Sequence, residues 1–217
     1  DTTKADAQNF SRLTLGYNDL SLGTNQYTTS GAWNEALLYQ MGRVNYKFDD
    51  RYLLTATVRR DGYSGFAKNN KFAIFPSVAL AWNINQEKFF NVKWVDQLKL
   101  RAGWGISGNQ TSRYKSLAKV TMSSAYVFGD GGQTEIGQKV STMANSDLKW
   151  EKTEGLNFGL DFAVLNSRIN GTLDVYFNTT RDLLYDLAIP TMTGFSTVSS
   201  NIGKLRNKGI EFTVTSR

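Results

Sequence analysis

Hydrophobic and polar residues alternate with a period of two in several long segments of this chain, and that alternation restricts its fold more than any other feature. In an extended strand, successive side chains point to opposite faces, so such a segment has one apolar and one polar face. The clearest segment runs from Leu98 to Ser107 and has apolar side chains at Leu98, Leu100, Ala102, Trp104 and Ile106. We therefore predict an all-β fold.

Further segments alternate in the same way, and they exceed the ~5–6 residues that are usual for strands of soluble proteins. These segments are Leu38–Phe48, Tyr52–Asp61, Phe75–Ile84, Leu156–Val164, Ile169–Phe177 and Gly209–Thr215. Residues 1–34 show no such pattern. We accordingly expect a poorly patterned N-terminal or loop segment over 1–34 and a region of about seven long strands over 35–217.

The connections between these strands also alternate, in this case between short and long. Tight links at 49–51 and 165–167 are interleaved with long loops at 62–72, 108–150 and 182–208, and only the link at 85–97 is of medium length. Outer-membrane β-barrels have this asymmetry, because their periplasmic turns are short and their external loops are long. The pattern predicts a segment of an antiparallel transmembrane β-barrel.

Aromatic residues gather near the tight links, where a barrel would meet the membrane interface. An interfacial girdle requires rings of this kind, and its members here would be Tyr46, Phe48, Tyr52, Trp82, Phe89 and Phe90. The same rings could instead fill the core of a soluble β-sandwich. Both interpretations remain open at this point.

Composition excludes several classes of function. The chain has no Cys and no His, which excludes disulfide scaffolds, Cys/His zinc sites, thiol nucleophiles and Ser-His-Asp triads. It also has no run of eighteen apolar residues, so any crossing of a membrane would be made by strands. The net charge of +6 is best explained by a solvated surface, since the basic residues are scattered over several loops. We expect no nucleic-acid partner, no metal site and no cofactor.

Two motifs that suggest chemistry are rejected on their context. The segment Gly103–Gly108 matches the dinucleotide fingerprint G-x-G-x-x-G, but that motif needs a strand-to-helix turn, whereas Trp104 and Ile106 continue the apolar face of a strand. Charged side chains are also ordinary in a water-filled barrel interior. We therefore expect no catalytic pair among the carboxylates Glu151, Glu154 and Asp161.

A series of short motifs then occurs in a fixed order over residues 37–217. It comprises Gly42–Tyr46, Asp50–Thr57, Phe75–Trp82, Leu98–Gly103, Ser107–Gln110, Asn145–Glu151, Gly194–Phe195, Asn201–Lys204 and Asn207–Gly209. In combination these motifs resemble the SusC/RagA family of TonB-dependent transporters. The sequence departs from the family pattern at Tyr63, Ala67 and Ala73, all within or beside one external loop.

The resemblance implies a barrel of about 22 strands closed by an N-terminal plug, in the bacterial outer membrane. Neither a plug nor a TonB box is recognisable here, so we expect the chain to be part of a larger barrel. Members of this family import oligosaccharides or peptides together with a SusD-like surface lipoprotein and the TonB complex, and their barrels contact outer-membrane lipid. The resemblance implies transport without enzymatic activity.

Three aromatic residues in the loop 108–150 are the candidate substrate contacts: Tyr114, Tyr126 and Phe128. Aromatic faces stack on sugar rings and on peptide side chains, although packing within the loop is an alternative explanation. Two other functions remain open for the chain as a whole. A passive porin or adhesin barrel would have the same strands, and a soluble β-sandwich binding module would have similar alternation.

Overall fold

The computed structural model describes residues 1–10, 19–127, 134–195 and 197–217, which form two compact units. In the first unit, Asp1–Glu35, strand β1 (Thr2–Gln8) pairs with β2 (Thr24–Gly31), and a 3₁₀ turn, η2 (Leu20–Leu22), lies between them. Nearly every residue of both strands is exposed. Because neither face is buried, the sequence has no alternation there that would predict this hairpin.

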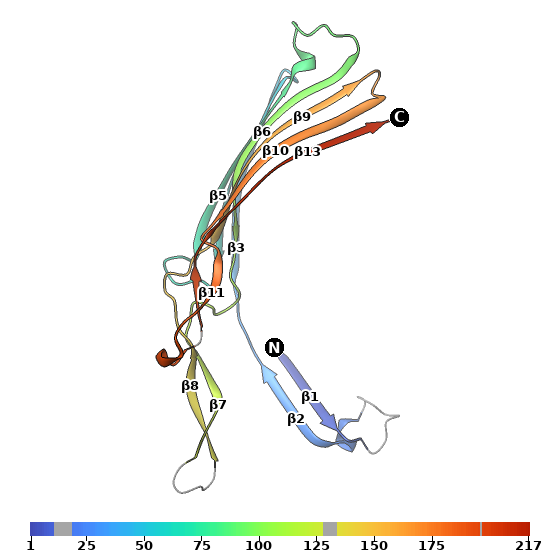
Figure 1. Cartoon of the computed structure of the whole chain (residues 1–217). Helices are drawn as coiled ribbons and strands as arrows, with labels where there is room; N and C mark the ends of the chain where they lie inside the picture. The colour runs from blue at the N-terminus through green and yellow to red at the C-terminus, as the bar shows by residue number, and fades with distance from the viewer. Residues whose placement is uncertain (11–18, 128–133, 196) are drawn as a thin grey trace. The chain divides into compact units, whose positions relative to one another are not determined.

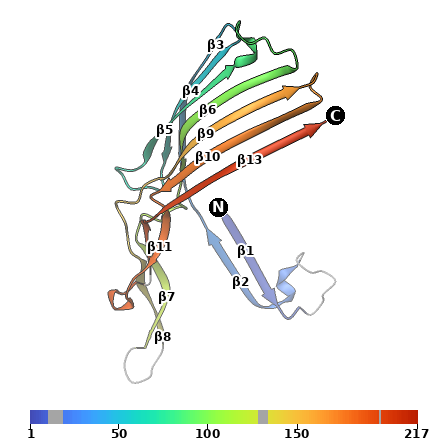
Figure 2. The same ribbon diagram turned by 45° about the horizontal axis from the view of Figure 1, so that its top comes forward.

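The second unit, Ala36–Arg217, is built on one antiparallel sheet of seven strands in the order β13-β10-β9-β6-β5-β4-β3 (Figures 1 and 2). All seven strands predicted from the alternation are present. Their bounds are β3 (Leu37–Phe48), β4 (Tyr52–Tyr63), β5 (Phe72–Asn83), β6 (Val95–Asn109), β9 (Glu151–Val164), β10 (Ile169–Arg181) and β13 (Lys204–Ser216). Among the residues that the structure describes, no helix is long and apolar enough to cross a membrane.

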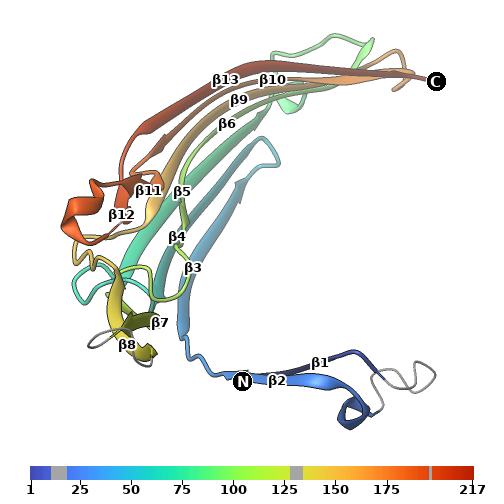
Figure 3. The ribbon, with the colours of Figure 1, turned by 60° about the horizontal axis from the view of Figure 1, so that its bottom comes forward.

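The sheet is curved (Figure 3), and one of its faces is apolar and exposed. The register aligns apolar side chains in rows across the strands, and one such row contains Trp82, Leu100, Leu160, Leu173 and Phe212. Leu100 is 42% exposed and Phe212 is 65% exposed. A soluble monomer rarely exposes so continuous an apolar surface, whereas a barrel wall presents one to lipid.

The opposite face carries polar and small side chains. One row of this face contains Tyr176, Asn157, Gly103, Ala79 and Thr55. Such a face suits water inside a barrel, where interior and exterior positions alternate along each strand. We call these two surfaces the apolar face and the polar face.

The two tight connections lie at the same end of the sheet and are closed by left-handed residues. Between β3 and β4, Asp49 and Asp50 have φ of 51° and 55°, and the Arg51 amide donates to the Phe48 carbonyl at 3.0 Å. Two consecutive residues with positive φ make the type I′ turn that matches strand twist. The β9–β10 link has the same character, with positive φ at Leu165, Asn166 and Ser167.

The aromatic residues predicted as a girdle do gather at this tight end. Tyr46, Phe48, Tyr52 and Trp82 stack in sequence, with successive ring centroids 6.4–6.5 Å apart. A short 3₁₀ turn, η3 (Ile84–Gln86), then brings Glu87 beneath them. There Glu87 accepts hydrogen bonds from Tyr52 Oη at 2.6 Å and Trp82 Nε1 at 2.9 Å, and these bonds lower the pKa of its carboxyl.

The long connections contain secondary structure of their own. Residues 108–150 include a hairpin of β7 (Lys119–Val127) and β8 (Thr134–Thr142). Residues 182–208 include β11 (Leu184–Ala188), η4 (Thr191–Thr193) and β12 (Thr197–Asn201), with β11 and β12 paired. β7 and β8 form a separate two-stranded sheet. In the main sheet β9 therefore pairs directly with β6.

The described chain leaves one edge of β3 and one edge of β13 without a partner strand. In hydrocarbon, each unpaired backbone group costs several kcal/mol, and in water an apolar edge invites aggregation. We therefore predict that the isolated 217-residue chain will aggregate or remain disordered in buffer, as followed by circular dichroism and light scattering. A sharp two-state unfolding transition of the soluble monomer would contradict this prediction.

A second prediction concerns the apolar face. Leu160→Arg places a charge on this face at about mid-height, and we expect it to lower the free energy of unfolding of the full-length barrel by ~2–4 kcal/mol in lipid vesicles. Ser216→Arg is the matched control, because Ser216 lies on the same face at the tight-turn end and should cost only ~0–1 kcal/mol. Equal tolerance of both substitutions would argue against contact with lipid.

Candidate functional site

A buried aromatic core at the long-loop end of the sheet supports the loops. It consists of Tyr63, Phe66, Ala73, Phe75, Leu148 and Trp150. Trp150 lies between two of these rings, with its centroid 5.0 Å from Phe66 and 5.6 Å from Phe75. The core thus joins loop 62–72 to the end of loop 108–150. Aromatic pairs at such distances add stability beyond the area they bury, so this junction is firm.

The position of the core depends on where two strands separate. Pairing between β5 and β6 ends at Ser77 and Gly105, next to Pro76, whose nitrogen carries no hydrogen for a ladder bond. Beyond that point the Phe75 ring lies over Gly108, where a Cβ atom would come within 2.0 Å of the ring. Glycine at this position therefore lets the ring approach the backbone of β6.

Hydrogen bonds join the loops 108–150 and 182–208. Asn201 accepts from the Lys149 amide at 2.9 Å and donates to the Lys149 carbonyl at 2.8 Å, so its side chain pairs with a backbone as a strand would. Asn201 Nδ2 also donates to the carbonyl of Asp182 at 2.9 Å. Asn145 Nδ2 adds a bond to the carbonyl of Ser199 at 2.8 Å.

An ion pair makes a further link between these two loops. Lys115 contacts the Asp186 carboxylate, which also accepts a hydrogen bond from Ser199 Oγ. Both hydrogen bonds lower the pKa of Asp186, and the bond from Lys115 has the larger effect. The carboxylate is therefore ionised at neutral pH and presents fixed negative charge between the two loops.

A polar cleft of about 530 Å³ opens beside this ion pair. Its lining is rich in amide, hydroxyl and carboxylate groups, and consists of Asn109, Gln110, Thr111, Ser112, Lys115, Glu151, Leu184, Tyr185, Asp186 and Ser199. Groups of this kind both donate and accept hydrogen bonds. The cleft can therefore hold a ligand with many hydroxyl or amide groups.

The three aromatic residues selected from the sequence occupy different places. Tyr114, with φ of 59°, is 37% exposed and lines a smaller pocket of about 130 Å³ together with Lys115 and Asp186. Tyr126 is 49% exposed on β7, opposite Glu135. Phe128 lies outside the described residues. Of the two that the structure describes, Tyr114 is the one that lies beside the ion pair between the loops.

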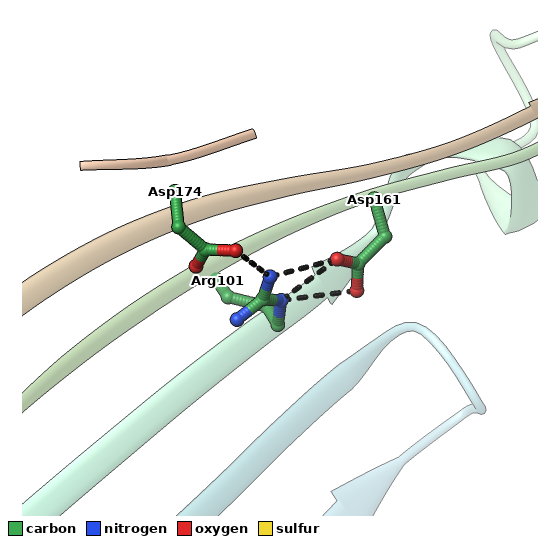
Figure 4. Close-up of polar contacts among 3 residues, drawn as sticks. All are labelled: Arg101, Asp161 and Asp174. Carbon is green, nitrogen blue, oxygen red and sulfur yellow. Dashed lines mark hydrogen bonds and ion pairs between the residues drawn. The ribbon is translucent and has the colours of Figure 1, made fainter. Parts of the chain in front are cut away.

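Lower on the polar face, an arginine bridges two carboxylates from neighbouring strands (Figure 4). Arg101 of β6 contacts Asp161 of β9 through Nε and Nη2 at 2.8–3.0 Å, and Nη2 also contacts Asp174 of β10 at 3.1 Å. Gly159 makes room for this group, because a Cβ atom there would lie 2.5 Å from the guanidinium carbon. The bridge fixes three strands to one another on the polar face.

The other motifs considered from the sequence also find structural explanations. Glu151 accepts a hydrogen bond from the Leu184 amide at 3.1 Å, whereas Glu154 has the strand parity of the apolar face and accepts from Trp104 Nε1 at 3.0 Å. The two carboxylates therefore project from opposite faces of β9. Gly103–Gly108 lies wholly within β6, with no turn into a helix.

Sequence reasoning did not select Asn201, Asp186 or the cleft residues 109–112 as site residues, although Asn109, Gln110 and Asn201 lie in motifs of the family resemblance. The alternation of strands gives no signal for them, because they lie where neither face is apolar. The Arg101 bridge could be predicted in part from the sequence, since Arg101 and Asp161 both fall on the polar face of their strands. The contact between them could not be predicted, because it depends on the register between strands that are far apart in the sequence.

Comparison with known proteins identifies the family to which this architecture belongs. Residues 1–217 match the family described as TonB dependent receptor-like, beta-barrel. The chain is 40% identical over 216 residues to TonB-dependent receptor P3 of Formosa agariphila, with 98% of this chain covered. It is 41% identical over 193 residues to TonB-dependent receptor SusC of Bacteroides thetaiotaomicron, with 87% covered.

Among solved structures, the RagAB peptide importer in its closed-closed state superposes with a TM-score of 0.77 at 29% identity, covering 90% of this chain and 21% of that chain. The chain likewise spans 21% of the length of receptor P3 and 19% of that of SusC. The match therefore concerns one part of a larger barrel. This chain belongs to the TonB-dependent receptors, and it forms part of the outer-membrane β-barrel of a SusC-like member.

Proposed function

We propose that this chain is part of the barrel wall of an importer that takes up oligosaccharides or peptides across the outer membrane. The observation that carries the proposal is the polar cleft between the two joined loops, at the long-loop end of a sheet with one apolar and one polar face. Hydrogen-bonding groups from several segments converge there. A sugar or a peptide backbone offers the matching donors and acceptors at short, regular intervals.

The proposed partners follow from the same relatives. SusC and the RagAB importer are relatives by sequence and structure, and the proposal extends to this protein a SusD-like surface lipoprotein that covers the external mouth. Energy would come from the TonB complex through parts of the protein outside this chain. The barrel wall would carry out no covalent chemistry, so its role is to bind the substrate, let it pass and contact outer-membrane lipid.

The substrate contacts proposed on this wall are the cleft, together with Tyr114, Tyr126 and Phe128. Tyr114 supports this role by its place beside the Lys115–Asp186 ion pair, and Tyr126 by its exposure on the hairpin of β7 and β8. Aromatic rings add stacking surface to a hydrogen-bonding cleft. The combination suits a ligand that has both polar edges and flat apolar faces.

Uptake by living cells tests the proposal. We expect cells that lack the full-length gene to lose uptake of either a fluorescent oligosaccharide mixture or a fluorescent oligopeptide mixture, and complementation to restore it. An uncoupler of the inner membrane should abolish the restored uptake, because the importer requires energy. Uptake that persists with the uncoupler would instead favour the passive porin, and loss of neither substrate class would refute the importer.

A prediction about affinity follows from the aromatic contacts. We expect Tyr114→Ala combined with Tyr126→Ala to weaken substrate binding by about 5- to 150-fold, since two aromatic contacts of ~0.5–1.5 kcal/mol each sum to ~1–3 kcal/mol. Phe89→Ala is the matched control, because Phe89 is 70% exposed at the tight end of the sheet and should leave binding unchanged. Titration calorimetry on the purified transporter measures the affinity of the wild type, the double variant and the control. Equal affinities in these three proteins would show that the two tyrosines do not belong to the binding site.

A prediction about orientation follows from the loop lengths. With the long loops outside, Gln138 of β8 faces the medium and Asn166 of the tight turn faces the periplasm. In a background free of cysteine, an impermeant maleimide should label Gln138→Cys on intact cells and leave Asn166→Cys unlabelled. Both variants should react once the cells are permeabilised. Labelling of Asn166→Cys on intact cells would reverse the orientation and separate the cleft from external substrate.

A further inference from the structure

Basic residues gather on the apolar face at its long-loop border. They come from three neighbouring strands and comprise Lys152, Arg181, Lys204, Arg206 and Lys208. The register brings them together: Arg181 of β10 pairs with Lys152 on one side and Lys204 on the other. Next to that row, Arg206 pairs with Thr179, and Lys208 pairs with Phe177. We call this group the basic border.

The positive charge of the basic border is largely unneutralised by the protein. All five side chains belong to exposed residues. One acid, Glu154, lies on the same face, and its carboxylate is 3.7 Å from Arg181 while it also accepts a hydrogen bond from Trp104. Within the described part of the chain, the other four basic residues form no ion pair. A group of like charges at this spacing attracts anions.

The basic border continues directly into the apolar surface. Its neighbours toward the tight end are Leu156, Phe177 and Ile210, which are 37%, 46% and 72% exposed. From Leu156 to Val164 the apolar stretch of β9, at ~3.3 Å per residue and a tilt of ~40°, covers about 23 Å along the membrane normal. This agrees with the ~25 Å height of the apolar band on outer-membrane barrels.

The two borders of the apolar face differ. At the tight end the face finishes in the stacked rings of Phe48, Tyr52 and Trp82, which are neutral. At the long-loop end it finishes in cations, whose long apolar stems can lie along the band while their charged ends reach the headgroup level. An amphiphile with acyl chains below and an anionic headgroup above matches this arrangement of charge and hydrocarbon.

We propose that the basic border binds the phosphate groups of anionic lipids in the leaflet on the long-loop side. Phosphate oxygens accept hydrogen bonds from guanidinium and ammonium groups, and each cation near a charged membrane surface adds a favourable contribution. The acyl chains of the bound lipids lie against Phe177 and Ile210. The bound lipids fix the depth of the sheet in the bilayer. They also support β13, the edge strand of the described sheet, at its long-loop end.

The test measures lipid selectivity of the full-length transporter in vesicles, by electron paramagnetic resonance with spin-labelled phosphatidylglycerol or phosphatidylcholine. The test variant combines Lys204→Gln, Arg206→Gln and Lys208→Gln. The control combines Lys68→Gln, Lys119→Gln and Lys139→Gln, which removes the same charge from exposed loop and hairpin positions. Wild type and control should prefer the anionic lipid at least about fivefold, and the test variant less than about twofold.

Two further measurements keep the proposal falsifiable if the test variant fails to assemble. A variant that keeps the charges, with Lys204→Arg, Arg206→Lys and Lys208→Arg, should retain the preference. In the wild type, 1 M salt should reduce it to less than about twofold, because the Debye length falls to ~3 Å. No preference in the wild type at low salt, or an equal loss in the control, would overturn the proposal. Transport itself is unaffected by either result, so the proposed function is tested separately.

Discussion

Pairing of backbone polar groups is the constraint on which the rest of this structure depends. Hydrocarbon offers no partner for an N–H or a C=O group, so strands that cross it must pair continuously with neighbours on both sides. The ladder of β9 with β6 and β10 meets this requirement along its whole length. Once the pairs are fixed, every side chain is assigned to one face, and the face decides whether it contacts lipid or water.

On the polar face, charged residues lie beside small residues. Arg101 bridges two carboxylates only because Gly159, on the same face, leaves its guanidinium enough space. At the loop end, Gly108 has the same role beneath Phe75. In both places the absence of a side chain lets a large neighbour approach the sheet. The aromatic core that results gives the long loops a rigid base beside the cleft.

The sequence predicted the seven strands of the sheet but shortened most of them at the long-loop end. For β10 the alternation ends at Phe177, whereas the strand continues to Arg181. The reason is physical: beyond the apolar band both faces meet water, so the ladder continues while the hydrophobic signal stops. The hairpins β1–β2, β7–β8 and β11–β12 escaped prediction because their strands lack a sustained apolar alternation. Tyr114, Tyr126 and Phe128 were selected as aromatic residues of a long loop, and their role in binding stays a prediction.

The sequence by itself determined the all-β class, the succession of the seven long strands along the chain, the parity of their side chains and the tight turns, because all of these are local. Period-two alternation and short links act within a few residues of one another. Only the tertiary structure decided which distant segments meet. Asn201 joins Lys149, and β9 lies beside β6, through contacts between residues far apart in the chain. Register across such distances results from pairing and packing of the whole sheet, which no single segment encodes.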